Sequence, residues 1–168
     1  MNMDPQEIIQ AAVRLEEDGR AFYLDAAARA ADPRVREVLE TLARDEENHI
    51  RWIRDTLGVD KSARELKEES YGRVKHVFAQ APEGSKEAFH LSRDELEPLR
   101  LAMGKEQQTW RAYGEWAGLV DDPALKELLA KLVEVEKFHE HLLENTLLYL
   151  EDPASFHQQD EGWLLDGG

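Results

Sequence analysis

The sequence predicts an all-α protein, a four-helix bundle made of two duplicated antiparallel helical hairpins joined by a long helical crossover. Three observations predict this fold. Apolar residues recur at three- and four-residue spacing in four long runs, which is typical of amphipathic helices. No stretch alternates apolar and polar residues as a half-buried strand does. The second half of the chain also repeats the first half without gaps, which indicates an internal duplication.

Asp-Pro pairs mark the start of three of the four predicted helices. Asp is a favourable N-cap residue and Pro is favoured at the first helical position. The pairs stand at residues 4–5, 32–33 and 122–123, and the predicted helices cover residues 5–31, 33–57, 93–120 and 123–151. Ser92 and Glu95 form a capping box that opens the third helix. Pro98 is expected to kink this helix or to shift its start.

The predicted organisation is one bundle over residues 1–152 and a C-terminal tail at 153–168 that lacks helical periodicity. The hairpins occupy residues 5–57 and 93–151, and the crossover occupies 58–92. Because about 11 extended residues would span a bundle roughly 35 Å long, the longer crossover is expected to form its own helices, at 61–69 and 71–78. A crossover of this length can also reach over a second subunit, so we expect a homodimer.

Composition excludes several classes of function. The 168 residues include 36 acidic and 21 basic side chains, for a net charge of −15, so neither nucleic acid nor an anionic membrane is an expected partner. The absence of Cys excludes disulfides, thiol catalysis and cysteine-ligated iron within this sequence. There is no signal-like start and no long apolar run. We therefore expect a cytoplasmic protein that attracts cations.

An offset of 90 residues aligns the two hairpins and their polar residues. The aligned pairs include Glu16 with Glu106, Tyr23 with Tyr113, Glu46 with Glu136 and His49 with His139. A Glu three residues before a His lies on the same helical face, and this motif occurs in both halves. A third Glu-x-x-His, at residues 87–90, has no counterpart in the repeat, and we interpret it as a chance occurrence.

The spacing brings these polar residues to one height in the bundle. Glu16 and Glu46 lie about 15 residues on either side of the first turn, hence roughly 22 Å from it at ~1.5 Å per residue. Glu106 and Glu136 repeat this arrangement about the second turn. Two packed hairpins would therefore gather four Glu and two His inside the bundle. Buried carboxylates at such density must either keep their protons or be neutralised by divalent cations.

This constellation resembles the rubrerythrin and bacterioferritin branch of the ferritin-like superfamily, and specifically a rubrerythrin-like protein without a rubredoxin domain. The resemblance covers residues 5–151. It implies a ferritin-like fold and two bound iron ions, with Mn or Zn as alternative metals. The implied metal ligands are Glu16, Glu46, His49, Glu106, Glu136 and His139. Motif symmetry favours Glu46 and Glu136 as bridging ligands, but members of the family differ in which Glu residues are shared, and the bridging roles are left open.

Two further features follow from the resemblance. The tyrosine that the family carries seven residues after each lone Glu corresponds to Tyr23 and Tyr113. Each is expected to hydrogen-bond a ligand carboxylate, to supply an electron, or only to pack in the core. Rubrerythrins proper carry an extra Glu three residues after the second lone Glu, where this sequence has Thr109. The implied ligand set is thus a simpler six-residue one, closer to that of bacterioferritin.

The expected function is that of a non-haem di-iron redox protein, a peroxidase or ferroxidase in oxidative-stress protection or iron handling. It would react with H₂O₂ or O₂ and receive electrons from a separate donor. The alternative is a non-catalytic iron-binding protein associated with storage, or a helical scaffold. The sequence leaves the native metal, the oxidant and the enzymatic activity open between these alternatives.

Overall fold

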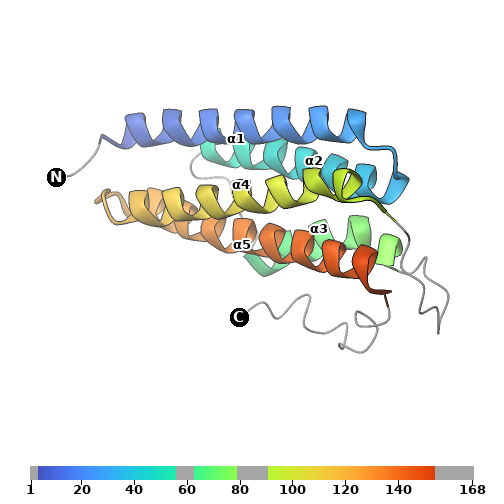
Figure 1. Ribbon diagram of the computed structural model, residues 1–168. Helices are drawn as coiled ribbons and strands as arrows, with labels where there is room; N and C mark the ends of the chain where they lie inside the picture. The colour runs from blue at the N-terminus through green and yellow to red at the C-terminus, as the bar shows by residue number, and fades with distance from the viewer. Residues whose placement is uncertain (1–3, 56–62, 79–90, 154–168) are drawn as a thin grey trace.

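The protein is an all-α bundle in the computed structural model, which describes residues 4–55, 63–78 and 91–153 (Figure 1). Within these ranges the chain forms helices and no strand. The elements are α1 (Pro5–Arg29), α2 (Pro33–Asp55), α3 (Ala63–Phe78), α4 (Arg93–Ala117) and α5 (Pro123–Glu151). The predicted all-α fold class is therefore confirmed.

Side-chain caps explain where the helices begin. Asp4 accepts a hydrogen bond from the backbone nitrogen of Gln6 at 2.9 Å. Asp32 accepts one from the backbone of Arg34, and Asp122 one from the backbone of Leu125, each at 2.8 Å. Each bond satisfies a helical N–H that has no partner within its own helix. The three Asp-Pro pairs are N-terminal caps, as the sequence predicted.

Helix α4 begins at its capping box and continues through its proline. The backbone nitrogen of Glu95 donates to Ser92 Oγ at 3.3 Å, and that of Ser92 donates to Glu95 Oε2 at 2.8 Å. Pro98 has no N–H, so the carbonyl of Asp94 loses its helical partner. Asp94 is exposed in the first turn, where water can bind this carbonyl. The proline therefore neither delays nor divides the helix.

Helix ends and the crossover differ in detail from the predicted limits. α1 ends at Arg29 rather than at residue 31, and α4 ends at Ala117 rather than at residue 120, where the backbone of Gly118 bonds back to Glu115. α5 ends at Glu151, as predicted. In the crossover, the two predicted short helices are one continuous 16-residue helix, α3. The Glu-x-x-His motif at 87–90 and the tail from residue 154 lie outside the described residues.

The two hairpins, α1–α2 and α4–α5, lie side by side with their turns at opposite ends (Figure 1). One apolar cluster contains Ala30 and Val35 at the first turn, and a second contains Val120 and Leu125 at the other turn. The space between these clusters is the middle of the bundle. Helix α3 packs against α2 and α5 of the same chain. No helix of the described residues has the length and apolar character needed to cross a membrane.

Candidate metal centre

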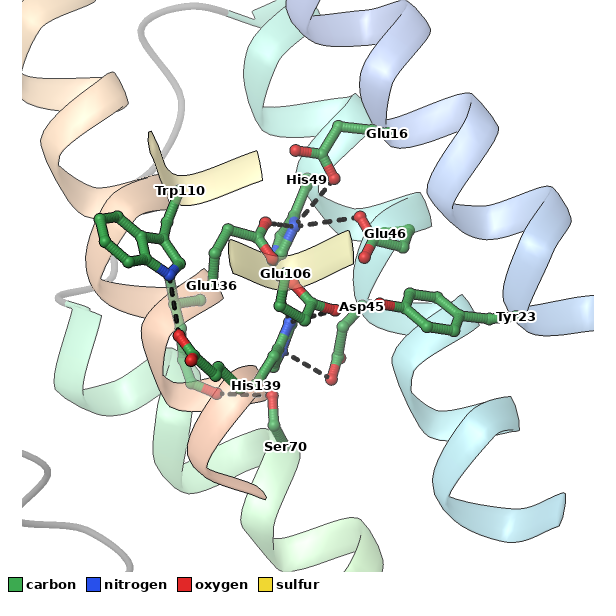
Figure 2. Close-up of polar contacts among 12 residues, drawn as sticks. Glu16, Tyr23, Asp45, Glu46, His49, Ser70, Glu106, Trp110, Glu136 and His139 are labelled. Carbon is green, nitrogen blue, oxygen red and sulfur yellow. Dashed lines mark hydrogen bonds and ion pairs between the residues drawn. The ribbon is translucent and has the colours of Figure 1, made fainter. Parts of the chain in front are cut away.

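The structure brings all six predicted metal ligands together between the two apolar clusters (Figure 2). Four helices contribute: α1 and α4 one Glu each, α2 and α5 a Glu and a His each. Each of these six residues is at most 3% exposed: Glu16, Glu46, His49, Glu106, Glu136 and His139. Their convergence follows from the matched heights of the two halves of the repeat.

His49 lies at the centre of one group of carboxylates. Its Nδ1 atom is 2.8 Å from Glu136 Oε1, 3.1 Å from Glu16 Oε2 and 3.6 Å from Glu46 Oε2. The three carboxylates come from α5, α1 and α2. One imidazole nitrogen therefore faces carboxylate oxygens from three helices, and Figure 2 shows these contacts as dashed lines.

His139 occupies the corresponding position in the second half of the repeat. Its Nδ1 atom is 3.3 Å from Glu136 Oε2 and 4.0 Å from Glu106 Oε1. The rings of His49 and His139 stack, with centroids 5.5 Å apart and planes inclined by 15°. The two imidazoles thus lie side by side, each directing Nδ1 toward carboxylates.

Donor atoms in the cluster form two overlapping groups with the spacing of metal ligands. One group contains Glu16, Glu46, His49 and Glu136, and the other contains Glu46, Glu106, Glu136 and His139. Within each group, one donor atom per residue lies within 4.8 Å of every other. Glu46 and Glu136 belong to both groups. This arrangement is able to hold two ions that share two carboxylates.

Two of the buried carboxyls are poor acids in this environment. Burial, and then the negative charges of Glu16 and Glu136, raise the pKa of Glu46 well above its ordinary value. Burial and the charge of Glu136 raise the pKa of Glu106 in the same way. Both groups therefore retain their protons to a higher pH than an exposed Glu does in the absence of a cation.

The two imidazoles supply the positive charge that the cluster otherwise lacks. Burial opposes the charged form of His139, but the Asp45 and Glu136 carboxylates, which face its two ring nitrogens as acceptors, outweigh burial and raise the pKa to about 10. Burial likewise opposes protonation of His49, and the charges of Glu136 and Glu16 raise its pKa well above the usual range. The charge of His49 in turn outweighs burial and lowers the pKa of Glu136. Protons thus neutralise the cluster where divalent cations could do so instead.

The two predicted tyrosines connect the hairpins. Tyr23 on α1 donates a hydrogen bond to Oε1 of Glu106 on α4, and Tyr113 on α4 donates one to Oε1 of Glu16 on α1. Burial, followed by the charge of the accepting Glu, raises the pKa of each tyrosine well above 10. Each hydroxyl therefore stays protonated and contacts a predicted ligand carboxylate.

Sequence reasoning missed a buried acid beside this cluster. Asp45 on α2 is 4% exposed, and its Oδ2 atom lies 3.5 Å from Nε2 of His139, on the far side of the ring from Glu136. Arg73 on α3 forms an ion pair with its other oxygen. Burial opposes ionisation, but the contact with His139 and the charges of His139 and Arg73 outweigh it and lower the pKa of Asp45. The available signal was its position directly before Glu46, although the repeat gave no acidic counterpart.

Comparison with known families agrees with this geometry. The family model described as Rubrerythrin matches residues 7–147. The chain belongs to the rubrerythrin family. No curated protein and no solved structure matches it. The family match spans the helical bundle, and the chain has no Cys with which a rubredoxin-type site would bind iron.

The donor set of this rubrerythrin-family bundle suits the metal ions that the family typically binds. Its carboxylates are hard, anionic oxygen donors and its imidazoles are nitrogen donors, which together suit iron. A Glu from each of two helices and a Glu-x-x-His from each of two others is the di-metal pattern of ferritin-like bundles. Four buried carboxyls at one place also need a compensating charge, which a pair of divalent cations provides. The residues present therefore fit a di-metal centre.

Gly19 adjoins the cluster at the position that aligns with Thr109. A Cβ atom added to Gly19 would lie 3.4 Å from Cδ of Glu46 and 3.5 Å from its Oε1 atom. At position 19, the rubrerythrin-family bundle therefore has room beside the Glu46 carboxylate for a methyl group but not for a large side chain.

His141, two residues past His139, has a 42% exposed side chain and pairs with Glu144 outside the cluster.

Proposed function

We propose that this member of the rubrerythrin family is a non-haem di-iron redox protein that reacts with H₂O₂ or O₂. The observation that supports it is the pair of overlapping donor groups, each with its own His and with two Glu in common. A single-metal site would need only one such group. A scaffold without a metal would have no use for four carboxyls buried at one point, because their burial is unfavourable without compensating charge.

In this proposal, each of the six residues has a defined role. Glu16 and His49 would hold one iron ion, and Glu106 and His139 would hold the other. Glu46 and Glu136 belong to both groups and would contribute to holding both ions. The two-fold repeat of α1–α2 in α4–α5 supports this assignment, because it gives each ion the same kinds of ligand.

The bound iron pair would supply two electrons, one from each Fe²⁺, so that H₂O₂ with two protons is reduced to two molecules of water. The chain excludes bulk water from this place, since the six predicted ligands are almost wholly buried. Tyr23 and Tyr113 keep a proton on their hydroxyls because burial and the neighbouring Glu raise their pKa. They also orient the Glu106 and Glu16 carboxylates through their hydrogen bonds.

The proposal also covers the electron donor, the cellular location and the oligomeric state. The sequence has no Cys for a cysteine-ligated iron, so a separate protein is proposed as the electron donor. The cytoplasmic location and the homodimer expected from the sequence remain proposals. Since α3 packs on helices of its own chain, the proposed dimer needs no exchange of this helix.

The proposal is tested by loading the protein anaerobically with two Fe²⁺ per chain and mixing it with H₂O₂ or O₂. The expected result is rapid, stoichiometric formation of ferric absorption in the near ultraviolet, followed by repeated turnover when a reductant is added. Glu47→Ala is the matched control, because Glu47 stands next to Glu46 with a 56% exposed side chain. This control is expected to react like the wild type.

Two results would contradict the proposal. One is the absence of iron oxidation by either oxidant in the loaded protein. The other is uptake of many iron atoms per chain without catalytic turnover, which would instead indicate iron storage. Comparison of the initial rates with the two oxidants, at equal concentration, identifies the preferred one.

A further inference from the structure

The two halves of the repeat differ at one buried position beside the cluster. The 90-residue offset that aligns the Glu and His residues also aligns Asp45 on α2 with Val135 on α5. Both residues are buried, and each directly precedes a Glu that belongs to both donor groups. The duplication is therefore broken at this position, with an acidic side chain in one half and an apolar one in the other.

Asp45 supports the ring of His139. The Oδ2 atom of Asp45 is 3.5 Å from Nε2 of His139, whereas Nδ1 of the same ring faces Glu136 and Glu106 (Figure 2). Arg73 of α3 binds the other oxygen of Asp45, which holds this carboxylate in place. A carboxylate behind a ligating imidazole fixes the orientation and tautomer of the ring and makes its other nitrogen a stronger donor.

His49 has Trp52 as a neighbour and lacks the acidic residue that His139 has. Neither Nε2 of His49 nor Nε2 of His139 makes a hydrogen bond among the described residues, but the Asp45 carboxylate lies 3.5 Å from Nε2 of His139, whereas every ion pair of His49 is made by Nδ1. The ring of Trp52 lies 4.9 Å from that of His49. Trp52 also packs against the cluster of Val135, Ala63 and Leu66, two of which belong to α3. Helix α3 thus contributes an apolar contact to the His49 half of the centre and an ionic one to the His139 half.

From this asymmetry we infer that the two metal positions are inequivalent, and that the position at His139 takes up its ion first because Asp45 and Arg73 support the imidazole. The inference rests on the proposed di-metal centre and adds two positioning residues to it. Loss of a comparable partner of a ligating His lowers metal affinity about 10- to 100-fold. The affinities of the two positions are therefore expected to differ by at least about tenfold.

The test follows the two imidazoles by NMR while metal-free, ¹⁵N-histidine-labelled protein is titrated with Zn²⁺. Zn²⁺ is diamagnetic, and His49→Gln and His139→Gln identify the two signals. At one equivalent of Zn²⁺, the signals of His139 are expected to shift while those of His49 keep their metal-free positions. The second equivalent is expected to shift the His49 signals. Simultaneous shifts of both rings, or earlier shifts of His49, would overturn the inference.

Asp45→Val makes the two halves alike, since it places the same residue at both aligned positions. It buries no new charge, and Arg73, with a 31% exposed side chain, keeps access to solvent. In this variant the two imidazoles are expected to respond together, with the first binding step weakened by at least about tenfold. Asp45→Asn retains an oxygen that can accept from Nε2 and is expected to give an intermediate result. An unchanged order of filling in Asp45→Val would contradict the inference.

The contribution of α3 is tested with a pair of charge-matched variants. Arg73→Met is expected to weaken the first binding step, whereas Lys75→Met, an exposed position on the same helix, is expected to leave it unchanged. Equal effects of the two variants would refute a specific role for Arg73. If wild-type protein binds no Zn²⁺ or Fe²⁺ at the six residues, the proposed function fails; if it binds two ions that fill together, only the present inference fails.

Discussion

Tyr23 on α1 donates its hydrogen bond to Glu106 on α4, although Glu16 lies two turns away on the same face of its own helix. The repeat generates the reciprocal bond from Tyr113 to Glu16. The hydroxyls thus join the two hairpins through the carboxylates that the metal ions would bind. Removal of one tyrosine hydroxyl therefore removes a hydrogen bond from a carboxylate of the opposite hairpin.

A double-mutant cycle tests this crossed pairing in the metal-free protein. Tyr23→Phe is expected to lower the free energy of unfolding by about 1–3 kcal/mol, because a buried carboxyl loses its hydrogen-bond partner. Combined with Glu106→Gln, it is expected to show a coupling energy above about 0.5 kcal/mol. The control cycle with Glu16→Gln is expected to be additive within that limit. Coupling of Tyr23 to Glu16 rather than to Glu106, measured by denaturant unfolding, would contradict the structure.

The stability of the metal-free protein is expected to fall as the pH is raised above neutrality. The pKa of His139 rises from 6.5 to about 10 in the folded state. A group whose pKa is higher in the folded state contributes its full stabilisation below the unfolded value, and this is lost as the pH rises toward the folded one. The pKa values of Glu46 and Glu106 are also raised in the folded state, so these two groups likewise lower the stability as the pH rises above 4.5, the ordinary pKa of Glu.

Urea unfolding at pH 6.5 and pH 9, with chelator present, measures this dependence. Wild-type protein is expected to be less stable at pH 9. In Asp45→Asn the difference is expected to shrink, because the acceptor that faces Nε2 of His139 and raises the pKa of this ring loses its negative charge. Greater stability of the wild type at pH 9 than at pH 6.5 would show that these groups titrate otherwise.

Gly19 permits a small side chain but not a large one. Because the added Cβ would meet Glu46 at ordinary contact distance, Gly19→Ala is expected to retain metal binding and to gain up to ~1 kcal/mol of stability from its helix propensity. Gly19→Leu is expected to displace Glu46 and to weaken metal binding. Gly104→Leu is the control, since a Cβ there meets no atom within 4 Å. Equal metal binding by the two Leu variants, measured by calorimetry, would refute this role of Gly19.

The repeat predicted the cluster because the positions of the six residues depend only on helical spacing and on distance from the turns, both of which can be read from the sequence. Helical spacing sets the face of each Glu and His, and equal distances from the turns set their height, so the six residues required no knowledge of side-chain contacts. The fold class followed from the same pattern. The role of Glu46 and Glu136 in both donor groups agrees with the symmetry of the motif.

The partner of each tyrosine and the support of His139 were not predictable in the same way. Which Glu accepts from Tyr23 depends on how the two hairpins pack, and spacing along α1 does not determine this. Asp45 contacts His139 of α5 and Arg73 of the crossover, and both contacts join helices that are distant in sequence. The crossover has no counterpart in the repeat, and its docking on α2 and α5 depends on tertiary contacts that are distant in sequence.

Iron stoichiometry tests the central claim most directly. Metal-free protein is titrated anaerobically with Fe²⁺, and the ions bound per chain are counted for the wild type, for Glu46→Ala and Glu136→Ala, and for the controls Glu47→Ala and Glu134→Ala at exposed neighbouring positions. We expect two tightly bound ions in the wild type and in both controls, and loss of tight binding in the two variants of the shared carboxylates. Unchanged iron binding in those variants, or no tight binding in the wild type, would contradict the account.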